Sequence, residues 1–213
     1  MLRTLLVAAM TLDGSIGPMP LGSAQDRRLL LRLRAESDAS IIGAGTVRND
    51  DPELALDGGE LPGTRLRAVV SMSGNLDPEK KLFRRGPKPV IITELARRDE
   101  LGRRYADLAE VIGVPAINGQ LPVPGMLHHL RRLGVRRLLL EGGGGLNGAF
   151  LAADAVDEVY VTVVPVIAVD PSLPRLVRSP HSPAAPLLPL QLRSCRVEEE
   201  SGELFLHYIR RER

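Results

Sequence analysis

Short apolar runs alternate with segments of helical periodicity from residue 2 to residue 164, and this alternation constrains the fold most strongly. The runs at 2–10 and 67–72 are apolar enough to be strands buried on both faces. Between such runs, apolar residues recur at helical spacing, for example over 23–37 and 122–133. The alternation predicts a mostly parallel sheet with helices on both faces.

The end of the chain follows a different pattern. Residues 190–200 and 202–211 are rich in strand-forming residues and meet at Ser201-Gly202, which predicts an antiparallel pair. We therefore expect an α/β fold whose parallel sheet carries an antiparallel C-terminal strand pair. With 213 residues and no evident linker, the chain is expected to form a single domain over 1–213.

Composition excludes several classes of protein. The net charge is +2 and aromatic residues make up 3%, so we expect no nucleic-acid partner. The N-terminal apolar run is too short for a membrane span, which favours a cytoplasmic protein without a membrane partner. Cys195 is the single cysteine, so no internal disulfide can form, and we expect it to be an inert buried thiol. The four histidines, including His181, lack metal-ligand spacing, and we predict no metal.

The stretch "LLLEGGGGLNGAF" at 138–150 combines a strand end, four glycines and a helix expected over Leu146–Ala153. Backbone N–H groups at such a helix start form an anion site, so this loop predicts phosphate or cofactor binding. The alternative is a glycine turn that lets the helix pack tightly on the sheet. A P-loop is excluded because no Gly-Lys-Ser/Thr follows, and the G-x-G-x-x-G match comes too late in the chain for a Rossmann fingerprint. Glu141 ends the strand where open sheets bind ligands, or is simply a solvated carboxylate.

Four further residues are candidates. Thr46 and Asp50 are four residues apart in a short helical turn and share a face, although local capping explains them equally well. Asp13 precedes a glycine after the first strand, where turn formation is the alternative. Arg34 lies late on the first predicted helix. Its side chain would either clamp a phosphate or be a solvated arginine near the helix C-terminus.

Three segments in this order, "AMTLDGSIG", "LRAESDASIIGAGTVRNDDPEL" and "LLLEGGGGLNGAFLAADAVDEVYVTVVP", resemble the pyrimidine reductase family of riboflavin biosynthesis. The resemblance spans roughly residues 1–170 and implies a dihydrofolate-reductase-like fold and a homodimer. It also implies that NADPH reduces a ribosylamino-pyrimidine 5′-phosphate to the ribitylamino form. The family's frequent fusion partner, a zinc deaminase, is absent, because the sequence lacks H-x-E and P-C-x-x-C.

The resemblance also implies roles for particular residues. Cofactor contacts fall on Thr46, Asp50, Gly142, Gly143, Gly144, Gly145 and Leu146. Arg34, Leu54 and Glu141 would face the substrate, and Asp13 would lie at the edge of the active site. Glu141 or Asp13 would then stabilise a protonated imine at C1′ during hydride addition.

Two positions depart from the bacterial fused members of the family. Val7 replaces a frequent lysine and Asp57 a frequent arginine, so positive charge is lost where the resemblance implies that a substrate phosphate would bind. Arg65 or Arg67 could compensate for this loss, but nothing in the sequence shows it. Two alternatives therefore remain: a reductase of the same fold that acts on dihydrofolate or another pterin-like ring, and a non-catalytic NADPH-binding relative.

Overall fold

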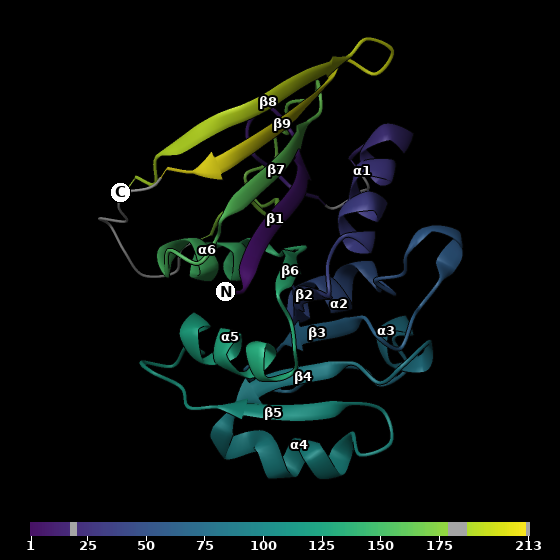
Figure 1. The fold of residues 1–213 in the computed structure, drawn as a ribbon, viewed down its shortest axis with the longest axis vertical. Helices are drawn as coiled ribbons and strands as arrows, with labels where there is room; N and C mark the ends of the chain where they lie inside the picture. The colour runs from purple at the N-terminus through teal and green to yellow at the C-terminus, as the bar shows by residue number, and fades with distance from the viewer. Residues whose placement is uncertain (18–20, 179–186, 212–213) are drawn as a thin grey trace.

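The computed structural model describes residues 1–17, 21–178 and 187–211. Across these residues, one nine-stranded sheet runs in the order β5-β4-β3-β2-β6-β1-β7-β9-β8 (Figure 1). All pairs from β5 to β7 are parallel, whereas β9 is antiparallel to both β7 and β8. The strands are β1 (Arg3–Met10), β2 (Ala39–Gly43), β3 (Leu66–Val70), β4 (Val90–Glu94), β5 (Glu110–Val114), β6 (Arg137–Leu140), β7 (Glu158–Val163), β8 (Leu190–Glu198) and β9 (Glu203–Arg210).

Helices cover both faces of the sheet, because successive strand residues point to opposite faces. Ile41 packs in the core that holds residues of α5 and α6, and its neighbour Ile42 packs with residues of α2, α3 and α4. Leu5 and Leu139 pack against α1 on the second face. The helices are α1 (Ala24–Ala35), α2 (Ala44–Asp50), α3 (Lys81–Arg84), α4 (Arg98–Arg104), α5 (Val123–Arg132) and α6 (Gly144–Ala152), with 3₁₀ turns η1 (Asp57–Gly59) and η2 (Leu95–Arg97).

The fold class predicted from the sequence is confirmed, and the differences are local. The sequence pattern predicts one helix over 95–108, and the structure has η2 followed by α4 there; α3 was not predicted. The sequence pattern also predicts a long strand over 157–168, but β7 ends at Val163, two residues before Pro165, which has no N–H to donate to a sheet. The prolines between residues 171 and 189 predict a loop, which lies partly outside the described residues, and His181 lies outside them.

Helix α6 begins at Gly144, two residues earlier than predicted. Glycine is a poor helix former, so the sequence favoured a loop at this point. The helical start places Gly144 and Gly145 in the first turn, where the backbone N–H groups have no partner within the helix. The glycines therefore belong to a helix N-terminus as much as to a loop.

The expectation that Cys195 is buried was wrong. Cys195 is exposed because β8 is the edge strand of the sheet, and its residues are mostly exposed on both faces. Leu192 and Val197 on the same strand are 50% and 58% exposed. The alternating pattern predicted the strand correctly but could not show that no described helix covers it.

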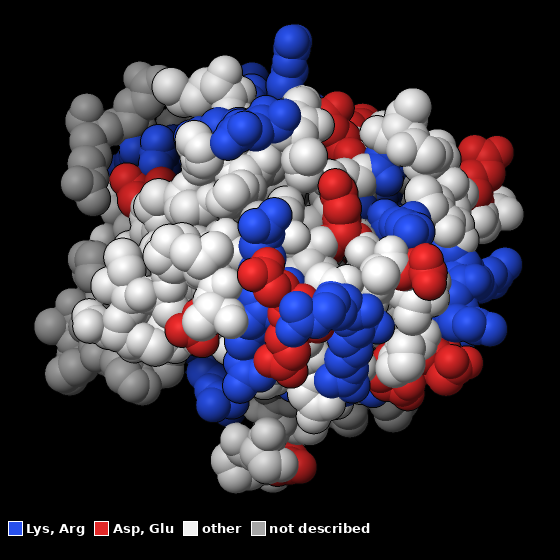
Figure 2. Space-filling view, turned by 90° about the horizontal axis from the view of Figure 1, so that it is seen from below, with Lys and Arg blue, Asp and Glu red and all other residues white. Residues whose placement is uncertain are grey.

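Charges of both signs are interspersed on the face seen in Figure 2. A nucleic-acid surface would instead gather basic side chains on one face. Within the described residues, no helix has the length and apolar character needed to cross a membrane.

Candidate active site

A cleft of about 740 Å³ opens at the carboxyl ends of β1, β2 and β6, three neighbouring strands in the middle of the sheet. Open α/β sheets bind ligands at this end of their strands. The described residues that line it are Val7, Ala8, Ala9, Ile16, Gly17, Leu21, Gly22, Asp26, Arg27, Leu30, Gly43, Gly45, Thr46, Asn49, Asp50, Glu141, Gly142, Gly143, Gly144, Gly145, Leu146, Asn147 and Pro174.

The segment that leads from β6 into α6 is held close to the end of β2. Glu141 N–H donates to the Ile41 carbonyl at 3.1 Å, and Gly43 N–H donates to the Gly142 carbonyl at 3.0 Å. Gly142 and Gly143 have φ values of 93° and 83°, a region that residues with a Cβ rarely adopt. Two of the four glycines are therefore required by the turn itself.

The other two glycines differ from each other. A Cβ on Gly144 would lie 2.2 Å from the carbonyl oxygen of Arg175, so this glycine permits close packing of the 174–178 segment. A Cβ on Gly145 would meet no atom within 4 Å. Gly145 thus leaves open space on the cleft side of the α6 N-terminus, where a ligand can approach the backbone.

The N-terminus of α6 has no side-chain cap. Its unpaired N–H groups and partial positive charge favour an anion. Asn147 in the same turn is fully buried, and its Nδ2 donates to the Leu176 carbonyl at 2.9 Å. Its Oδ1 has no hydrogen-bond partner among the described residues. This end of the cleft therefore offers backbone donors and one unused acceptor.

Thr46 and Asp50 lie on α2, the short helix in which their spacing predicted a shared face, and both line the cleft. Thr46 Oγ1 donates to the Gly142 carbonyl at 3.4 Å, which connects α2 to the glycine segment. Loss of hydration in the cleft raises the pKa of the Asp50 carboxyl. The structure thus brings the predicted cofactor residues together on one side of the cleft.

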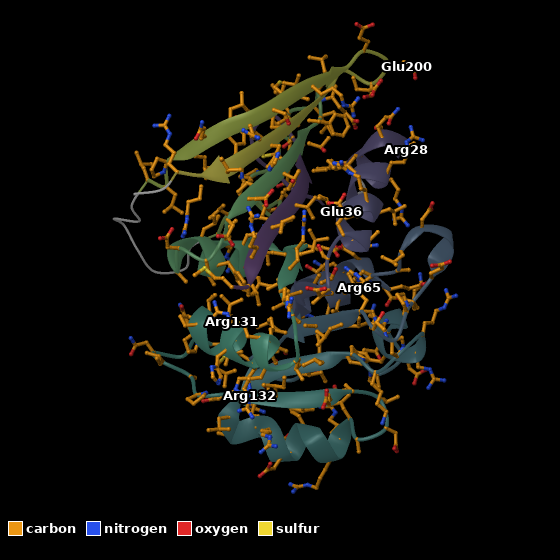
Figure 3. The ribbon with its side chains drawn as sticks, in the orientation of Figure 1. Arg28, Glu36, Arg65, Arg131, Arg132 and Glu200 are labelled. Carbon is orange, nitrogen blue, oxygen red and sulfur yellow. The ribbon has the colours of Figure 1, made fainter. Side chains whose placement is uncertain are left out.

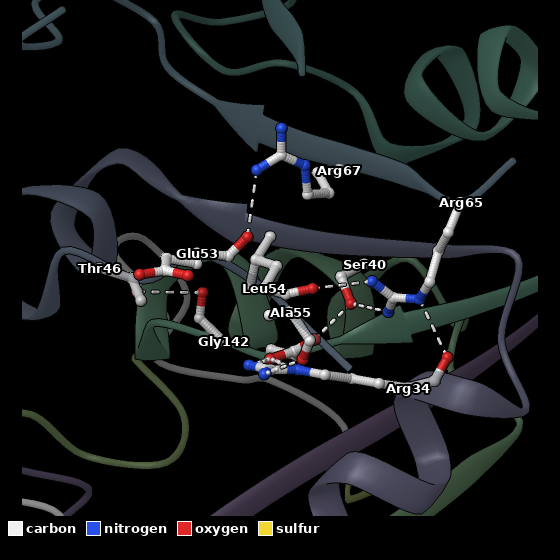
Figure 4. A network of polar contacts seen from close by, with 10 residues as sticks. Arg34, Ser40, Thr46, Glu53, Leu54, Ala55, Arg65, Arg67 and Gly142 are labelled. Carbon is white, nitrogen blue, oxygen red and sulfur yellow. Dashed lines mark hydrogen bonds and ion pairs between the residues drawn. The ribbon is translucent and has the colours of Figure 1, made fainter. Parts of the chain in front are cut away.

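Glu141 is held by a buried polar network that includes Arg34, Ser40 and Arg65, which Figure 4 shows close together. Arg34 Nη2 donates to Glu141 Oε2 at 2.6 Å, and Arg34 Nε donates to both carboxylate oxygens at 3.1 Å. The Ser40 hydroxyl donates to Glu141 Oε1 and accepts from Arg65 Nη2. The side chains of Arg34 and Glu141 are only 8% and 7% exposed, so the carboxylate reaches the cleft with its orientation fixed.

Arg34 and Leu54 lie behind Glu141 and are not among the described residues that line the cleft. The third nitrogen of Arg34, Nη1, donates to the Ala55 carbonyl at 2.8 Å. Leu54 is 2% exposed with φ of 58°, and its carbonyl accepts from Arg65 Nη1 at 3.1 Å. A phosphate clamp by Arg34 would have to break these bonds, so its observed contacts position Glu141.

Arg65 and Arg67 do not supply the lost positive charge to the cleft, since neither is among its described lining residues. Both are buried, and Figure 3 shows Arg65 in the interior below α1. Arg65 donates to the Arg34 and Leu54 carbonyls, and Arg67 donates to the carbonyls of Glu53 and Pro87. Burial lowers the pKa of Arg67 to about 10. Both guanidinium groups brace the backbone and do not face the cleft.

Asp13 lies outside the described lining of the cleft and ties two loops together. Its carboxylate accepts from Thr11 Oγ1 at 2.7 Å, Ser15 Oγ at 2.9 Å, Ala168 N–H at 2.8 Å and Arg175 Nη1 at 2.6 Å. These hydrogen bonds, that from Thr11 above all, hold the pKa of Asp13 well below its usual range. Asp13 is therefore ionised at neutral pH and has no proton to donate.

Sequence reasoning missed Ser40, Asn147 and Arg27. Ser40 is a polar residue within a buried strand, and Asn147 is an amide in an otherwise apolar helix, so both carried a signal. Arg27 was one of many arginines in the sequence, and no local pattern set it apart from the others. No group of three or more His, Cys, Asp or Glu side chains arranged for a metal occurs in the part of the chain that the structure describes.

Residues 4–201 match the family model described as the RibD C-terminal domain. The chain is 31% identical over 169 residues to the 2,5-diamino-6-ribosylamino-4(3H)-pyrimidinone 5′-phosphate reductase of Archaeoglobus fulgidus, covering 72% of this chain and 75% of that protein. It is 33% identical over 168 residues to the protein of the same name from Methanothermobacter thermautotrophicus, covering 75% and 76%.

The fold is also that of a solved pyrimidine reductase-like protein from Corynebacterium diphtheriae. The TM-score is 0.81 at 21% identity, and the match covers 99% of this chain and 92% of that one. The family model covers most of the chain, and the two archaeal relatives are more than 30% identical to it. The chain belongs to the RibD C-terminal domain family of reductases.

Proposed function

We propose that this chain is an NADPH-dependent reductase of riboflavin biosynthesis, acting on 2,5-diamino-6-ribosylamino-4(3H)-pyrimidinone 5′-phosphate. One observation carries the proposal: an uncapped, glycine-lined helix N-terminus and a rigidly held carboxylate, Glu141, share one cleft. The first suits a dinucleotide phosphate and the second suits a substrate that develops positive charge. The names of the archaeal relatives supply the substrate class.

The residues present fit a nicotinamide dinucleotide. Gly145 leaves space at the α6 N-terminus, and Asn147 Oδ1 is a buried acceptor without a partner among the described residues. Thr46 and Asp50 on α2 would hold polar groups of the cofactor, beside Gly142–Leu146. When bound, the nicotinamide supplies a hydride, and this chain's residues orient both reactants.

On the substrate side, Glu141 is placed to stabilise charge. Opening of the ribosyl ring gives an imine at C1′, which accepts a hydride best when protonated. A carboxylate in a fixed position stabilises that positive charge without reorganising during the reaction. Arg34 and Ser40 fix Glu141, whereas Asp13 keeps the neighbouring loops in place and takes no proton-transfer role.

The proposed enzyme is a single reductase domain that acts as a homodimer in the cytoplasm. The resemblance to the reductase family supports the dimer. Leu192 and Val197 on the edge strand β8 are exposed apolar residues that a second copy would cover. Light scattering on the purified protein tests the dimer, and a monomeric mass would contradict it.

An NADPH-oxidation assay with three substrates tests the activity. We expect turnover with the diamino pyrimidine phosphate and none with dihydrofolate. Turnover of only the deaminated pyrimidine would change the substrate, and turnover of dihydrofolate would favour a pterin-type reductase. A protein that binds NADPH but oxidises none with either pyrimidine would be the non-catalytic relative.

A further inference from the structure

The cleft has an unusual balance of charge for a site that receives phosphates. Three described acids line it, namely Asp26, Asp50 and Glu141, and Arg27 is the one Lys or Arg among its described lining residues. Arg34 already neutralises Glu141. Among the described side chains that line the cleft, Arg27 is therefore the one that can offer a positive charge to a phosphate dianion.

Other arginines around the cleft are already bonded. Arg34 is bonded to Glu141 and Ala55, Arg65 to Arg34, Leu54 and Ser40, Arg67 to Glu53 and Pro87, Arg48 to Asn75, and Arg175 to Asp13. Arg27, by contrast, is exposed and forms no side-chain hydrogen bond or ion pair with any described residue. Its guanidinium keeps all five N–H donors for a ligand.

The backbone that carries Arg27 is firmly anchored. Arg27 lies in the first turns of α1, and its N–H donates to the Ser23 carbonyl at 3.0 Å. The Ser23 side chain caps α1, and its own N–H donates to the buried carboxylate of Glu203 at 2.7 Å. The backbone of Arg27 is therefore already ordered, and only its side chain has to become ordered when a ligand binds in the cleft.

We propose that Arg27 binds a phosphomonoester in the cleft. A guanidinium pairs with such a dianion through two parallel hydrogen bonds. Two groups of the proposed reaction have this chemistry: the 5′-phosphate of the pyrimidine substrate and the 2′-phosphate of NADPH. The inference rests on the proposed reductase function.

Calorimetric titration of the full chain tests the proposal with four proteins: wild type, Arg27→Ala, Arg27→Lys and Arg28→Ala. Arg28 is the matched control, because it lies on the same helix outside the described lining and donates to Gln25 (Figure 3). Each protein is titrated with NADPH, NADH, ribose 5-phosphate and ribose. The KM for the phosphorylated pyrimidine is measured in parallel.

Arg27→Ala should weaken binding of the phosphate-bearing ligand by about tenfold or more, as expected for a charge-assisted contact. Arg27→Lys should keep part of this affinity, and Arg28→Ala should bind the ligand as wild type does. Loss of the preference for NADPH over NADH assigns the site to the cofactor 2′-phosphate. A loss of affinity confined to ribose 5-phosphate, together with a raised KM for the pyrimidine phosphate, assigns the site to the substrate 5′-phosphate.

Equal affinity of wild type and Arg27→Ala for every phosphate-bearing ligand overturns the inference and leaves the proposed function standing. A wild-type protein that binds neither nicotinamide nor the pyrimidine overturns both. An equal loss in Arg28→Ala also overturns the inference, because it would reflect the net charge of α1 and not a contact in the cleft.

Discussion

Under the proposed function, the two sides of the cleft would recognise their ligands by opposite means. On the side of α6, recognition rests on backbone N–H groups, missing side chains and an uncapped helix. On the side of Glu141, it rests on charged side chains that are already bonded to one another. The N–H groups on the first side have no partner within the helix and can bind an anion, whereas the charged groups on the second side are already bonded without a ligand.

This difference separates binding from stability. Few bonds depend on the open space at Gly145, so a change there should alter ligand affinity and leave folding intact. The Arg34–Glu141 pair is buried, and each partner leaves a desolvated charge behind when the other is removed. A change there should reduce both folding stability and activity.

Arg34→Ala should have the largest effect. We expect it to lower the free energy of unfolding by about 3–5 kcal/mol, because it leaves the Glu141 carboxylate buried and unpaired. Urea unfolding followed by circular dichroism measures the change. The control is Arg85→Ala, which breaks a solvent-exposed pair of similar length (2.7 Å to Glu53) and should cost about 0–1 kcal/mol. Equal losses in the two variants would show that the network does not differ from a surface pair.

Gly145→Val should have the next largest effect, on binding alone. The added side chain enters open space and should raise the dissociation constant for NADPH by roughly tenfold or more, about 1.4 kcal/mol. The free energy of unfolding should change by less than about 1 kcal/mol, because glycine is itself unfavourable in a helix. Fluorescence titration and urea unfolding measure the two quantities.

Gly144→Ala is the contrasting variant at the next position. Its Cβ would overlap the Arg175 carbonyl, so it should destabilise the fold by about 1–3 kcal/mol through forced backbone shifts. If Gly145→Val binds NADPH as wild type does, the open space beside α6 is not part of the cofactor site.

A smaller effect is expected from pH at the loop contact of Asp13. Its pKa is lowered in the folded state, so ionised Asp13 stabilises the fold above the unfolded-state pKa of about 3.9, and that contribution is lost as pH falls below it. Asp13→Asn should therefore be less stable than wild type at pH 7, and the difference should shrink towards pH 3. Unfolding midpoints at several pH values measure it, and a difference independent of pH would show that the charge of Asp13 is irrelevant.

The sequence predicted much of the fold because its signals are local. Apolar runs marked β1 and β6, and Ser23 marked the start of α1, where its side chain does cap the helix. The exposure of Cys195 was missed because it depends on β8 lying at the sheet edge, which only the strand order reveals.

Long-range contacts explain the errors at the site. Arg34 and Glu141 are 107 residues apart in the chain, and no local pattern distinguishes a buried paired arginine from a solvated one. Likewise, Arg65 reaches Ser40 across 25 residues, so its burial could not be read from its surroundings. The glycines were found because their pattern is local, but the packing of Gly144 on Arg175 was not visible in it.

The division of the cleft is tested most directly by the KM values of two conservative variants, Asp50→Asn on α2 and Glu141→Gln beside β6. We expect Asp50→Asn to raise the KM for NADPH more than the KM for the pyrimidine phosphate. We expect Glu141→Gln to lower kcat or raise the pyrimidine KM, with the NADPH KM nearly unchanged. The reverse pattern, with Glu141→Gln acting chiefly on NADPH, would contradict this division of the cleft.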